Sequence, residues 1–394
     1  MSPGSTPRRA PINPWRRRFI ARMTMASLVM ELPALTLLGV GLHRRAGLAP
    51  GWALGVSALV FLAGALVLFR RLARWADDAR APWWRVWLLE VPYTVGVTLC
   101  FLTAWLSLPL GALGLLGYLL GAPWSVLPAL AVVHALGLLA ALWGCTVGRL
   151  VPRVVRREVR IEGLAPALDG YTIAQLSDLH LGPYVPRWLY RAWVRRALSL
   201  DPDLVALTGD YITAGEGYLD DVEDFVRRCQ APDGVAACMG NHDYFFTEEG
   251  VARALERGGA RHLRNRGFAV ERGGATLWIA GVDDRWSRRD DLGRALEGRP
   301  RGAPVVLLAH DPAQFPRFVS EGVQLTLSGH THGGQFAVPF FPRWNLARVG
   351  QRYTAGVYRE GPSTLFVHAG LGTSGPPARF GTRPEVALLV LRAG

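Results

Sequence analysis

Residues 323 to 335 read VQLTLSGHTHGGQ, a short apolar run that leads directly into two histidines, His330 and His332, set among glycines. The aliphatic and β-branched residues of this run, bounded by a turn signal, predict a strand. In α/β sheets, ligands gather outside the carboxyl ends of the strands. The segment therefore predicts an α/β domain with a functional site at one edge of its sheet.

Four further blocks of the same kind precede this one, and each follows a predicted strand. They are Asp178-Leu179-His180, Gly209-Asp210, Gly240-Asn241-His242-Asp243 and Ala309-His310. One such block is common by chance, but five of the nine histidines fall in this ordered series. Histidine, aspartate and asparagine together suit two divalent ions that neutralise a phosphoryl group and activate water. The series predicts a two-metal phosphoesterase.

Predicted strands and helices alternate from about residue 156 to the C-terminus, which indicates an α/β domain. The strands are expected at Tyr171 to Leu176, Leu204 to Thr208, Val235 to Met239, Thr276 to Ala280, Pro304 to Ala309 and Val323 to Leu327. Helices are expected at Arg187 to Leu200, Tyr218 to Cys229 and Glu249 to Arg257. Gly209 and Gly240 directly precede ligands, where the lack of a side chain lets the backbone approach the metals closely.

The blocks resemble those of the calcineurin-like metallophosphoesterase family over about residues 159 to 394. The form of the last block is similar to that of a membrane-associated bacterial branch, which includes UDP-2,3-diacylglucosamine pyrophosphohydrolases. The resemblance implies two packed mixed β-sheets flanked by helices, and attack on phosphorus by a metal-bridging hydroxide. It also implies a ligand set in which Asp178, His180 and His332 hold one metal, Asn241, His310 and His330 hold the other, and Asp210 bridges them.

The same resemblance assigns a catalytic role to His242, which would bind the phosphate and protonate the leaving oxygen, and makes Asp243 the residue that orients its ring. The residue types support this, because a histidine beside a carboxylate can act as a general acid near neutral pH. Two divalent ions are the expected cofactors. We expect Mn²⁺, with Fe or Zn²⁺ as alternatives, because all three tolerate these ligands.

Substrate contacts are expected from two segments near the last block. Arg379 and Arg383 suit either phosphate contacts or structural ion pairs. Phe340, Phe341 and Trp344 suit either the lipid interface or an acyl groove, with burial against the core of the domain as the alternative.

The N-terminal part of the chain is unusually apolar. The mean hydropathy of the whole chain is +0.17, and 50% of its residues are hydrophobic. Apolar stretches long enough to cross ~30 Å of hydrocarbon as helices run from Met23 to Leu42, Trp52 to Phe69, Trp87 to Leu106 and Leu127 to Val147. We therefore expect an α-helical transmembrane unit of about four helices. The segment from Pro109 to Pro123 either extends the third helix or forms a re-entrant segment.

The predicted domain organisation follows from these boundaries. Residues 1 to 22 form a basic cytoplasmic tail, 23 to 148 the transmembrane unit, 149 to 158 a linker and 159 to 394 the metallophosphoesterase domain. The four cysteines lack the C-x-x-C spacing of a zinc knuckle and indicate no disulfide framework.

The net charge of +13 lies entirely in the N-terminal part. Residues 1 to 157 contain 17 arginines and 4 acidic residues, whereas the remainder contains 27 basic and 27 acidic residues. Nucleic-acid binding is therefore not expected. Most of the arginines flank one side of the spans, and only Arg44 and Arg45 lie on the other. The positive-inside rule then places the catalytic domain in the cytoplasm, at a bacterial inner membrane. Arg16-Arg17-Arg18-Phe19-Ile20 resembles a twin-arginine signal and leaves export as an alternative.

These features together predict a membrane-anchored hydrolase that cleaves a phosphodiester, pyrophosphate or phosphomonoester bond on a lipid or lipid precursor. Two alternatives remain. One is a phosphodiesterase for a soluble nucleotide-type substrate, with the membrane unit used for localisation. The other is a non-catalytic membrane sensor or transporter that uses the domain for binding. The expected partners are the lipid bilayer and a phosphorylated lipid-like or small-molecule substrate.

Overall fold

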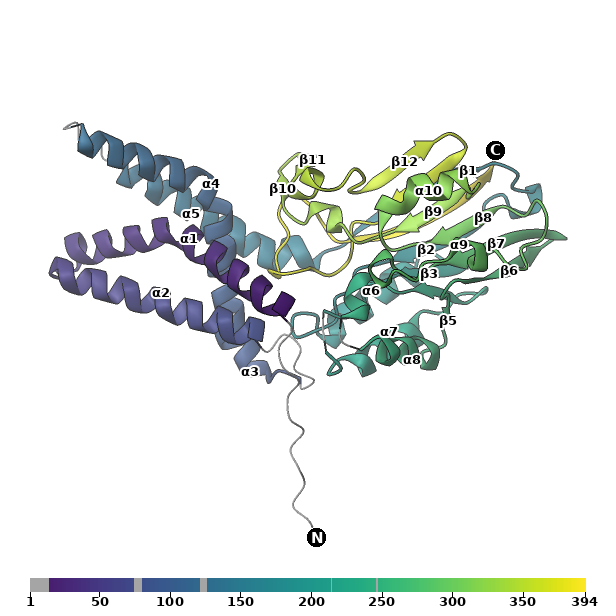
Figure 1. The fold of residues 1–394 in the computed structure, drawn as a ribbon, viewed down its shortest axis with the longest axis horizontal. Coiled ribbons are helices and arrows are strands. Elements are labelled where there is room, and N and C mark those ends of the chain that lie inside the picture. The colour runs from purple at the N-terminus through teal and green to yellow at the C-terminus, as the bar shows by residue number, and fades with distance from the viewer. Residues whose placement is uncertain (1–13, 74–79, 121–125, 214, 246) are drawn as a thin grey trace, which may run out of the picture. The chain divides into compact units, whose positions relative to one another are not determined.

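The computed structural model describes residues 14–73, 80–120, 126–213, 215–245 and 247–394 (Figure 1). The chain forms two compact units. The first comprises Met1–Trp75 and Leu89–Ala140, and the second comprises Ala76–Leu88 and Ala141–Gly394. The residues from Ala141 to Gly148, which the sequence assigns to the membrane unit, thus belong to the compact unit that carries the catalytic motifs.

The first unit is helical. Its helices are α1 (Pro14–Arg45), α2 (Pro50–Ala73), α4 (Val91–Leu119) and most of α5 (Leu127–Trp143). Helix α1 packs against α2 and α4. Helix α4 continues through Pro109 to Leu119, so the segment after this proline extends the third helix; residues 121–125 lie outside the described part of the chain.

Helices occupy all four predicted spans, and two of the four are supported as candidate membrane helices. Within the described residues, two helical stretches are long and apolar enough to cross a membrane, namely Trp83–Gly114 and Leu127–Gly148. In α2, the described residues include a shorter apolar stretch, Pro50–Gly64. Large apolar side chains of both longer stretches are exposed, among them Trp105 and Leu136, as expected for contact with lipid.

The second unit contains two six-stranded mixed sheets, which confirms the predicted α/β fold. The first sheet has the order β1 (Arg153–Ile161), β14 (Glu385–Ala393), β2 (Thr172–Leu176), β3 (Leu204–Thr208), β4 (Val235–Cys238) and β5 (Arg261–His262). The second has the order β12 (Gly356–Glu360), β13 (Ser363–Val367), β9 (Leu325–Ser328), β8 (Val305–Leu308), β7 (Ala275–Gly281) and β6 (Arg266–Arg272). A separate hairpin joins β10 (Ala337–Val338) to β11 (Phe341–Asn345).

The two sheets pack face to face. Alternate side chains of each strand point to opposite faces, so one set from each sheet points into the space between the sheets. In the first sheet, Ile173 and Ala206 point towards the second sheet and meet Ile279, Val306 and Leu327 in one buried cluster. Each large aliphatic side chain removed from water in this way contributes about 1.5–3 kcal/mol. The two sheets therefore share a continuous core.

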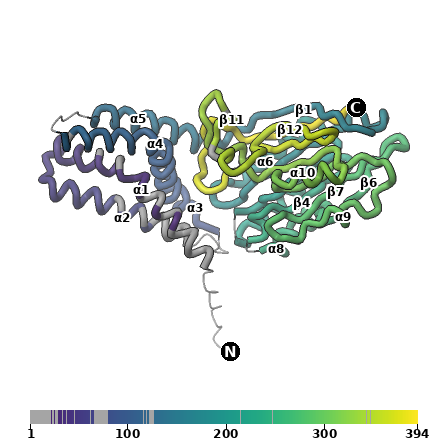
Figure 2. Tube along the Cα trace, turned by 45° about the horizontal axis from the view of Figure 1, so that its top comes forward, coloured from purple at the N-terminus to yellow at the C-terminus, as the bar shows by residue number. Residues whose placement is uncertain are grey.

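Helices cover the outer faces of both sheets. Helices α6 (Arg187–Leu198), α7 (Leu219–Arg228) and α8 (Glu248–Arg257) cover the first sheet through a second buried cluster. Helices α9 (Leu292–Ala295) and α10 (Phe315–Ser320) cover the second sheet, and Figure 2 shows α9 beside β6 and β7. The architecture is a four-layer arrangement of helices, sheet, sheet and helices.

The start of the second unit differs from the predicted domain boundaries. Arg153 to Glu158, predicted as part of a linker, lie in β1 and pair in parallel with β14. In this edge strand Val155, Val159 and Ile161 are buried, whereas the charged side chains are exposed. Before β1, a π-helical turn (Gly144–Gly148) ends the α5 helix, and Arg149 donates hydrogen bonds to the carbonyls of Cys145 and Tyr184 at 2.7 and 2.9 Å. The end of α5 is thus fastened to the catalytic unit.

Candidate metal centre

The five sequence blocks meet at one edge of the two sheets. The strands β2, β3 and β4 of the first sheet and β8 and β9 of the second each lead directly into one block. The loops are tied to one another, since the Asp178 amide donates to the Gly209 carbonyl at 2.9 Å and the Gly329 amide donates to the His310 carbonyl at 3.0 Å. The predicted convergence of the blocks is therefore present in the structure.

The backbone of the ligand loops is strained at the residues whose side chains point into the site. Five of the predicted ligands have a positive φ, a conformation that costs about 1–3 kcal/mol each for residues other than glycine. They are Asp178, His180, Asp210, His330 and His332. Strain of this kind persists only where the surroundings enforce it, which indicates that these loops are built around the position of their side chains.

Gly240 shows how closely the loops approach. A Cβ atom at this position would overlap Asp210 Oδ1 and would lie 2.8 Å from His310 Cε1. Gly209, with a φ of 92°, is equally confined by the backbone of Gly240. Both glycines therefore lie where two ligand loops meet too closely for a side chain.

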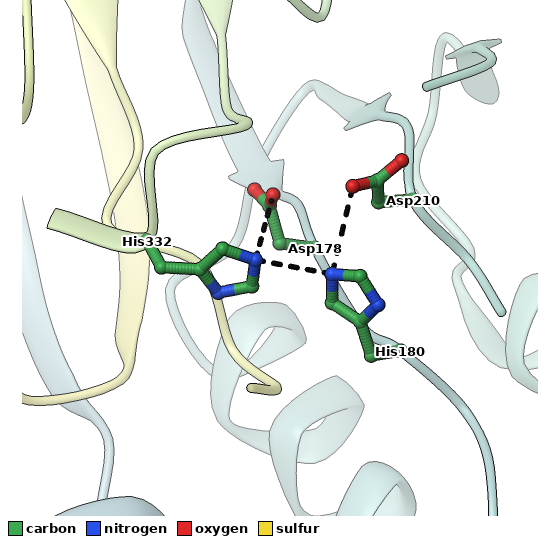
Figure 3. A group of neighbouring side chains, drawn as sticks. All are labelled: Asp178, His180, Asp210 and His332. Atoms are coloured by element: carbon green, nitrogen blue, oxygen red, sulfur yellow. Dashed lines mark hydrogen bonds and ion pairs between the residues drawn. The ribbon is translucent and has the colours of Figure 1, made fainter. Parts of the chain in front are cut away.

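Four of the predicted ligands form a first, wholly buried group: Asp178, His180, Asp210 and His332 (Figure 3). The Nε2 atoms of His180 and His332 face each other at 3.0 Å. His332 Nε2 lies 3.4 Å from Asp178 Oδ1, and His180 Nε2 lies 3.5 Å from Asp210 Oδ2. Four ligand atoms thus point to one position.

A second group contains Asp210, His310 and His330. His310 Nε2 lies 3.3 Å from Asp210 Oδ2, and Asn241 Oδ1 lies 2.9 Å from His330 Nδ1. His330 and Asn241 are only partly buried. The single oxygen Oδ2 of Asp210 therefore stands between Nε2 of His180 in one group and Nε2 of His310 in the other. This is the position required of a bridging carboxylate.

The electrostatics of the site fit divalent ions. Burial, followed by the neighbouring His242, lowers the pKa of His180 to about 3, so this imidazole stays neutral and able to ligate at neutral pH. His332 also has a pKa well below its ordinary value because of burial and the proximity of His180. Two neutral imidazole nitrogens that face each other repel unless a proton or an ion lies between them. A divalent ion satisfies both lone pairs.

Asp210 and His310 are the most strongly coupled charges of the site. Although burial opposes it, the nearby His310 holds the pKa of Asp210 well below its ordinary value, and Asp210 in turn raises the pKa of His310. Within the described residues, His310 Nε2 is buried without a hydrogen-bond partner. A buried nitrogen aimed at a carboxylate but not hydrogen-bonded is typical of a metal ligand.

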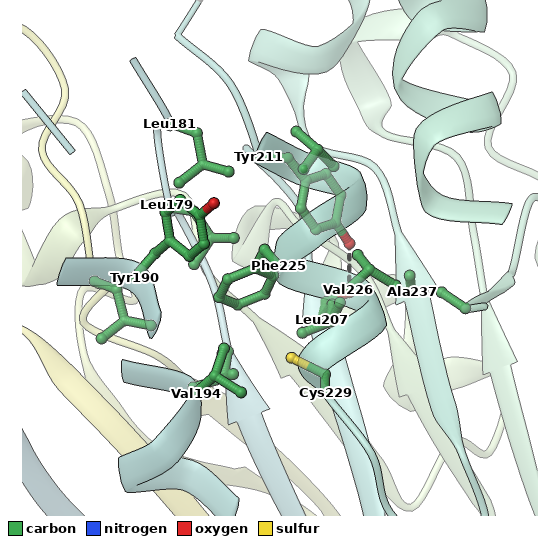
Figure 4. Close-up of a cluster of buried hydrophobic side chains, with 14 of the residues drawn as sticks. Leu179, Leu181, Tyr190, Val194, Leu207, Tyr211, Phe225, Val226, Cys229 and Ala237 are labelled. Carbon is green, nitrogen blue, oxygen red and sulfur yellow. Dashed lines mark hydrogen bonds between the residues drawn. The ribbon is translucent and has the colours of Figure 1, made fainter. Parts of the chain in front are cut away.

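A second layer of contacts orients the ligands. His310 Nδ1 lies 2.7 Å from the Thr208 carbonyl, which fixes the proton on that nitrogen and leaves Nε2 for the site. The His330 amide donates to Asp178 Oδ1 at 2.9 Å. Side chains next to the ligands, including Leu179, Leu181 and Tyr211, are buried beneath the loops (Figure 4). The loops are therefore anchored from below by the hydrophobic core.

His242 lies beside the first group, as expected of a group that contacts the substrate. Its ring packs edge-on against His180, with ring centroids 4.7 Å apart. Its amide donates to Asp210 Oδ1 at 2.9 Å, and its Nδ1 lies 3.1 Å from the Thr213 carbonyl. The Thr213 carbonyl accepts a hydrogen bond from Nδ1, which orients the ring.

The predicted role of Asp243 needs correction. Its buried carboxylate accepts hydrogen bonds at 2.9 Å from the amides of Gly240, Asp210 and Tyr211. It thus holds the backbone of two ligand loops, whereas the His242 ring is oriented by the Thr213 carbonyl. A carboxylate is well suited to this task because it offers several lone pairs to converging amides.

The predicted substrate contacts occupy three different settings. Arg379 is fully buried and donates to the carbonyls of His332, Ala369 and Gly372 at 2.6–3.1 Å, with an amino nitrogen 3.3 Å from His332 Nδ1. These partners replace the phosphate or carboxylate that the sequence suggested. Arg383 is exposed and donates to the Val151 carbonyl at 3.2 Å. The three aromatic residues are exposed on the β10–β11 hairpin, namely Phe340, Phe341 and Trp344.

One residue at the same edge was not singled out from the sequence. Asp284 follows β7, is buried, and has a pKa raised to about 6, chiefly by burial. It accepts a hydrogen bond from the Trp286 amide at 2.7 Å and adds to the negative potential around His310. The signal was present, because Asp283 and Asp284 follow the predicted strand Thr276 to Ala280 after two residues.

Comparison with known proteins assigns the family. A family model described as calcineurin-like phosphoesterase matches residues 171–334. A transmembrane protein with metallophosphoesterase domain from Danio rerio is 32% identical over 266 residues, covering 64% of this chain and 60% of that protein.

Two bacterial relatives are matched over more of their length. The uncharacterized metallophosphoesterase YkuE of Bacillus subtilis is 31% identical, with 57% of this chain and 80% of that protein covered. An uncharacterized metallophosphoesterase of Aquifex aeolicus is 33% identical, with 61% of this chain and 92% of that protein covered. With the five blocks gathered around a shared aspartate, the chain belongs to the calcineurin-like metallophosphoesterase family.

Proposed function

We propose that this chain is a membrane-anchored metallophosphoesterase that hydrolyses a phosphodiester, pyrophosphate or phosphomonoester bond on a lipid or lipid precursor. The observation that carries the proposal is the sharing of Asp210 Oδ2 between two groups of ligands. Within the unit that contains this site, the Arg379 amide donates to the carbonyl of Gly144, near the end of the apolar helical stretch Leu127–Gly148.

The residues around the site have separate tasks. Asp178, His180 and His332 would hold one ion, Asn241, His310 and His330 the other, with Asp210 between them. When bound, two such ions neutralise the charge of the phosphoryl oxygens and lower the pKa of water. The chain contributes a rigid frame for them, because the core and the strained loops fix the ligand atoms before any substrate arrives.

His242 is the proposed general acid. Its Nδ1 donates a hydrogen bond to the Thr213 carbonyl, and its ring packs edge-on against His180. In this orientation Nε2 contacts the phosphoryl group and donates a proton to the leaving oxygen. General acid catalysis of this kind contributes about 10²–10⁴-fold in rate, most when the leaving group is a poor one.

A lipid-type substrate is supported by the connection of the site to the apolar helix. The Arg379 amide donates to the Gly144 carbonyl at 3.0 Å, and the Arg379 guanidinium donates to the carbonyl of His332 at 3.1 Å. One residue therefore links the end of the candidate span to a metal ligand. The short link supports a metal centre held near the membrane surface, within reach of a phosphate at headgroup depth.

The proposed location is the cytoplasmic face of a bacterial inner membrane. It is supported by the arginines that flank the apolar stretches on one side. A periplasm-dependent reporter fused after Gly394 should be inactive in this topology. An active reporter would instead support export of the catalytic unit.

The substrate class is tested with the full chain purified in detergent and loaded with Mn²⁺. We expect the chain to hydrolyse a phosphorylated or pyrophosphate-linked lipid. The kcat/KM for this lipid should be at least about tenfold above that for a water-soluble phosphodiester with the same leaving group, which corresponds to about 1.4 kcal/mol in activation free energy. Equal values, or a preference for a nucleotide phosphodiester, would reject the lipid proposal while retaining the hydrolase. If Asp210→Asn kept its activity on both the lipid and the water-soluble phosphodiester, the hydrolase itself would be rejected.

A second test uses living cells. A strain that carries His242→Ala in place of the wild-type chain should accumulate the uncleaved phosphorylated lipid or precursor. Profiling of both lipids and soluble metabolites identifies the substrate directly. Accumulation confined to soluble nucleotides would favour the alternative function.

A further inference from the structure

The hairpin of β10 and β11 exposes a group of large apolar side chains. Phe340, at its turn, is 96% exposed, and Trp344 is 72% exposed, while Val338 and Phe341 are also exposed. The rings of Phe341 and Trp344 lie together, with centroids 6.2 Å apart. We call residues 338–344 the hairpin tip. Water contact with so much aromatic surface is unfavourable, so a cluster of this kind indicates a binding surface.

The charge of the segment is one-sided. From Phe336 to Arg359 the sequence contains four arginines and no acidic residue. Arg343, within the hairpin tip, and Arg348, four residues after its end, are exposed. Aromatic rings flanked by arginines are typical of surfaces that lie at the boundary of lipid headgroups and acyl chains, where anionic headgroups attract the guanidinium.

The root of the hairpin is fastened to the end of the apolar helix α5. The Ala337 amide, at the start of the hairpin, donates to the Phe380 carbonyl at 2.8 Å, and the preceding residue Arg379 donates its amide to the Gly144 carbonyl at 3.0 Å. The contact with the helix is close, since a Cβ atom on Gly148 would overlap the Arg379 carbonyl. All of these residues belong to the second compact unit.

The candidate span Leu127–Gly148 ends at this contact. A membrane helix leaves the hydrocarbon at its end, so residues fastened there lie close to the bilayer surface. Trp143, Val147 and Val151, around the same end, are also exposed apolar residues. The hairpin tip is therefore connected to the point at which the chain would leave the membrane.

We propose that the hairpin tip docks on the bilayer surface beside the exit of α5, with Phe340, Phe341 and Trp344 in the headgroup region and Arg343 against anionic headgroups. A bilayer accounts for exposure, charge and attachment to the span together. Burial against the domain's own core, the alternative raised by the sequence, does not describe these three side chains.

Docking also bears on the metal centre. The hairpin begins five residues after His332. Its first strand is held by the Phe380 carbonyl, and the residue before Phe380 is Arg379, which donates a hydrogen bond to the His332 carbonyl. Docking would thus orient the ligand loop against the membrane surface. The inference rests on the membrane anchoring proposed above, but not on the chemical nature of the substrate.

The inference is tested by spin-label depth measurements on the full chain in vesicles of phosphatidylglycerol and phosphatidylcholine in equal amounts. Labels are placed by Val338→Cys in the hairpin tip, Leu136→Cys on α5 and Ser199→Cys at the opposite edge of the first sheet. The four native cysteines are buried. Collisions with oxygen, which concentrates in lipid, are compared with collisions with a water-soluble nickel complex.

We expect lipid-type accessibility at residues 338 and 136 and water-type accessibility at residue 199. Water-type accessibility at 338 together with lipid-type accessibility at 136 would overturn the docking while keeping the anchoring. Water-type accessibility at both would contradict the anchoring, and the docking with it. Shielding of residue 338 from both reagents would indicate a protein contact, such as a second copy of the chain, and would also overturn the inference.

A matched substitution separates docking from mere proximity. Phe340→Ser is added to the chain that carries the label at Val338→Cys. The ratio of oxygen collisions to nickel-complex collisions at the label should then fall at least about threefold, because one ring supplies much of the apolar area buried in the membrane. Adding Arg301→Gln, an exposed position elsewhere on the second unit, should leave the ratio unchanged. An equal response to both substitutions would overturn the assignment of the rings to the membrane.

Discussion

The two ligand groups share Asp210 but differ in their surroundings. In the first group all four side chains are buried, and His332 is held by the guanidinium of a buried arginine. In the second, His330 and its neighbour Asn241 are partly exposed. The side chains of the first group are therefore closed off from solvent, whereas those of the second are partly open to it.

The largest effect is expected where the two groups meet. Asp210→Asn removes the charge that both positions share and leaves the shape of the side chain nearly unchanged. Activity should fall by more than about 10³-fold, above the roughly 10- to 100-fold that outer contacts of metal sites contribute. Steady-state kinetics on a soluble phosphodiester with Mn²⁺ measures the loss, and an unchanged thermal midpoint shows that the fold is retained. A variant within tenfold of wild type would show that Asp210 is not shared.

His242→Ala tests the group that belongs to neither ion position. The rate should fall by about 10²-fold for a substrate with a poor leaving group such as an alkoxide, and by much less for p-nitrophenolate, which needs no proton. The measurement is kcat for a series of leaving groups of increasing pKa. An equal loss across the series would assign His242 to phosphate binding alone.

Arg379 distinguishes the closed position from the open one. Arg379→Lys keeps a charge but loses the planar set of donors that reaches three carbonyls and His332. We expect Mn²⁺ affinity at the first position to fall by about 10- to 100-fold, with little change at the second. Calorimetric titration measures both. Arg383→Lys, in the same segment but exposed, is the matched control for ion affinity. Equal losses at both positions would contradict a specific link to His332.

The smallest effect concerns the order in which the ions leave. Because His330 and Asn241 are partly exposed, a chelator should remove the ion of the second group before that of the first group. Its rate of removal should be several-fold higher, which corresponds to about 1 kcal/mol in the free-energy barrier to release. Ion content during timed dialysis reports the order, and His330→Ala should retain one ion per chain. Release of both ions in a single step would remove the distinction between the groups.

The sequence predicted the edge at which the site lies because each block directly follows an apolar run. Side chains such as those of Asp210 and His332 could be placed at this edge from chain order, since parallel strands bring their carboxyl ends together, whereas their assignment to particular ions came from the family resemblance. The strands β1 and β14 were missed as a pair because their contact joins residues more than 200 positions apart. Nothing in the local pattern of Arg153 to Ile161 distinguishes an edge strand from a charged linker.

The roles of Arg379 and Asp243 were beyond sequence reasoning for a different reason. Both side chains bind backbone groups of distant loops, and a backbone carbonyl or amide has no sequence signature. The same applies to the Thr208 and Thr213 carbonyls, which orient His310 and His242. Residue type indicates which chemistry is available, whereas the partner depends on which loops the fold brings together.

The most direct test of the account is the electron paramagnetic resonance spectrum of the Mn²⁺-loaded chain, recorded with its ion content. Two ions held about 3.5–4 Å apart by one carboxylate should give two Mn²⁺ per chain and an exchange-coupled spectrum, which Asp210→Asn should convert to that of an isolated ion. A single ion per chain, or two ions without magnetic coupling in the wild type, would contradict a centre built on a shared Asp210.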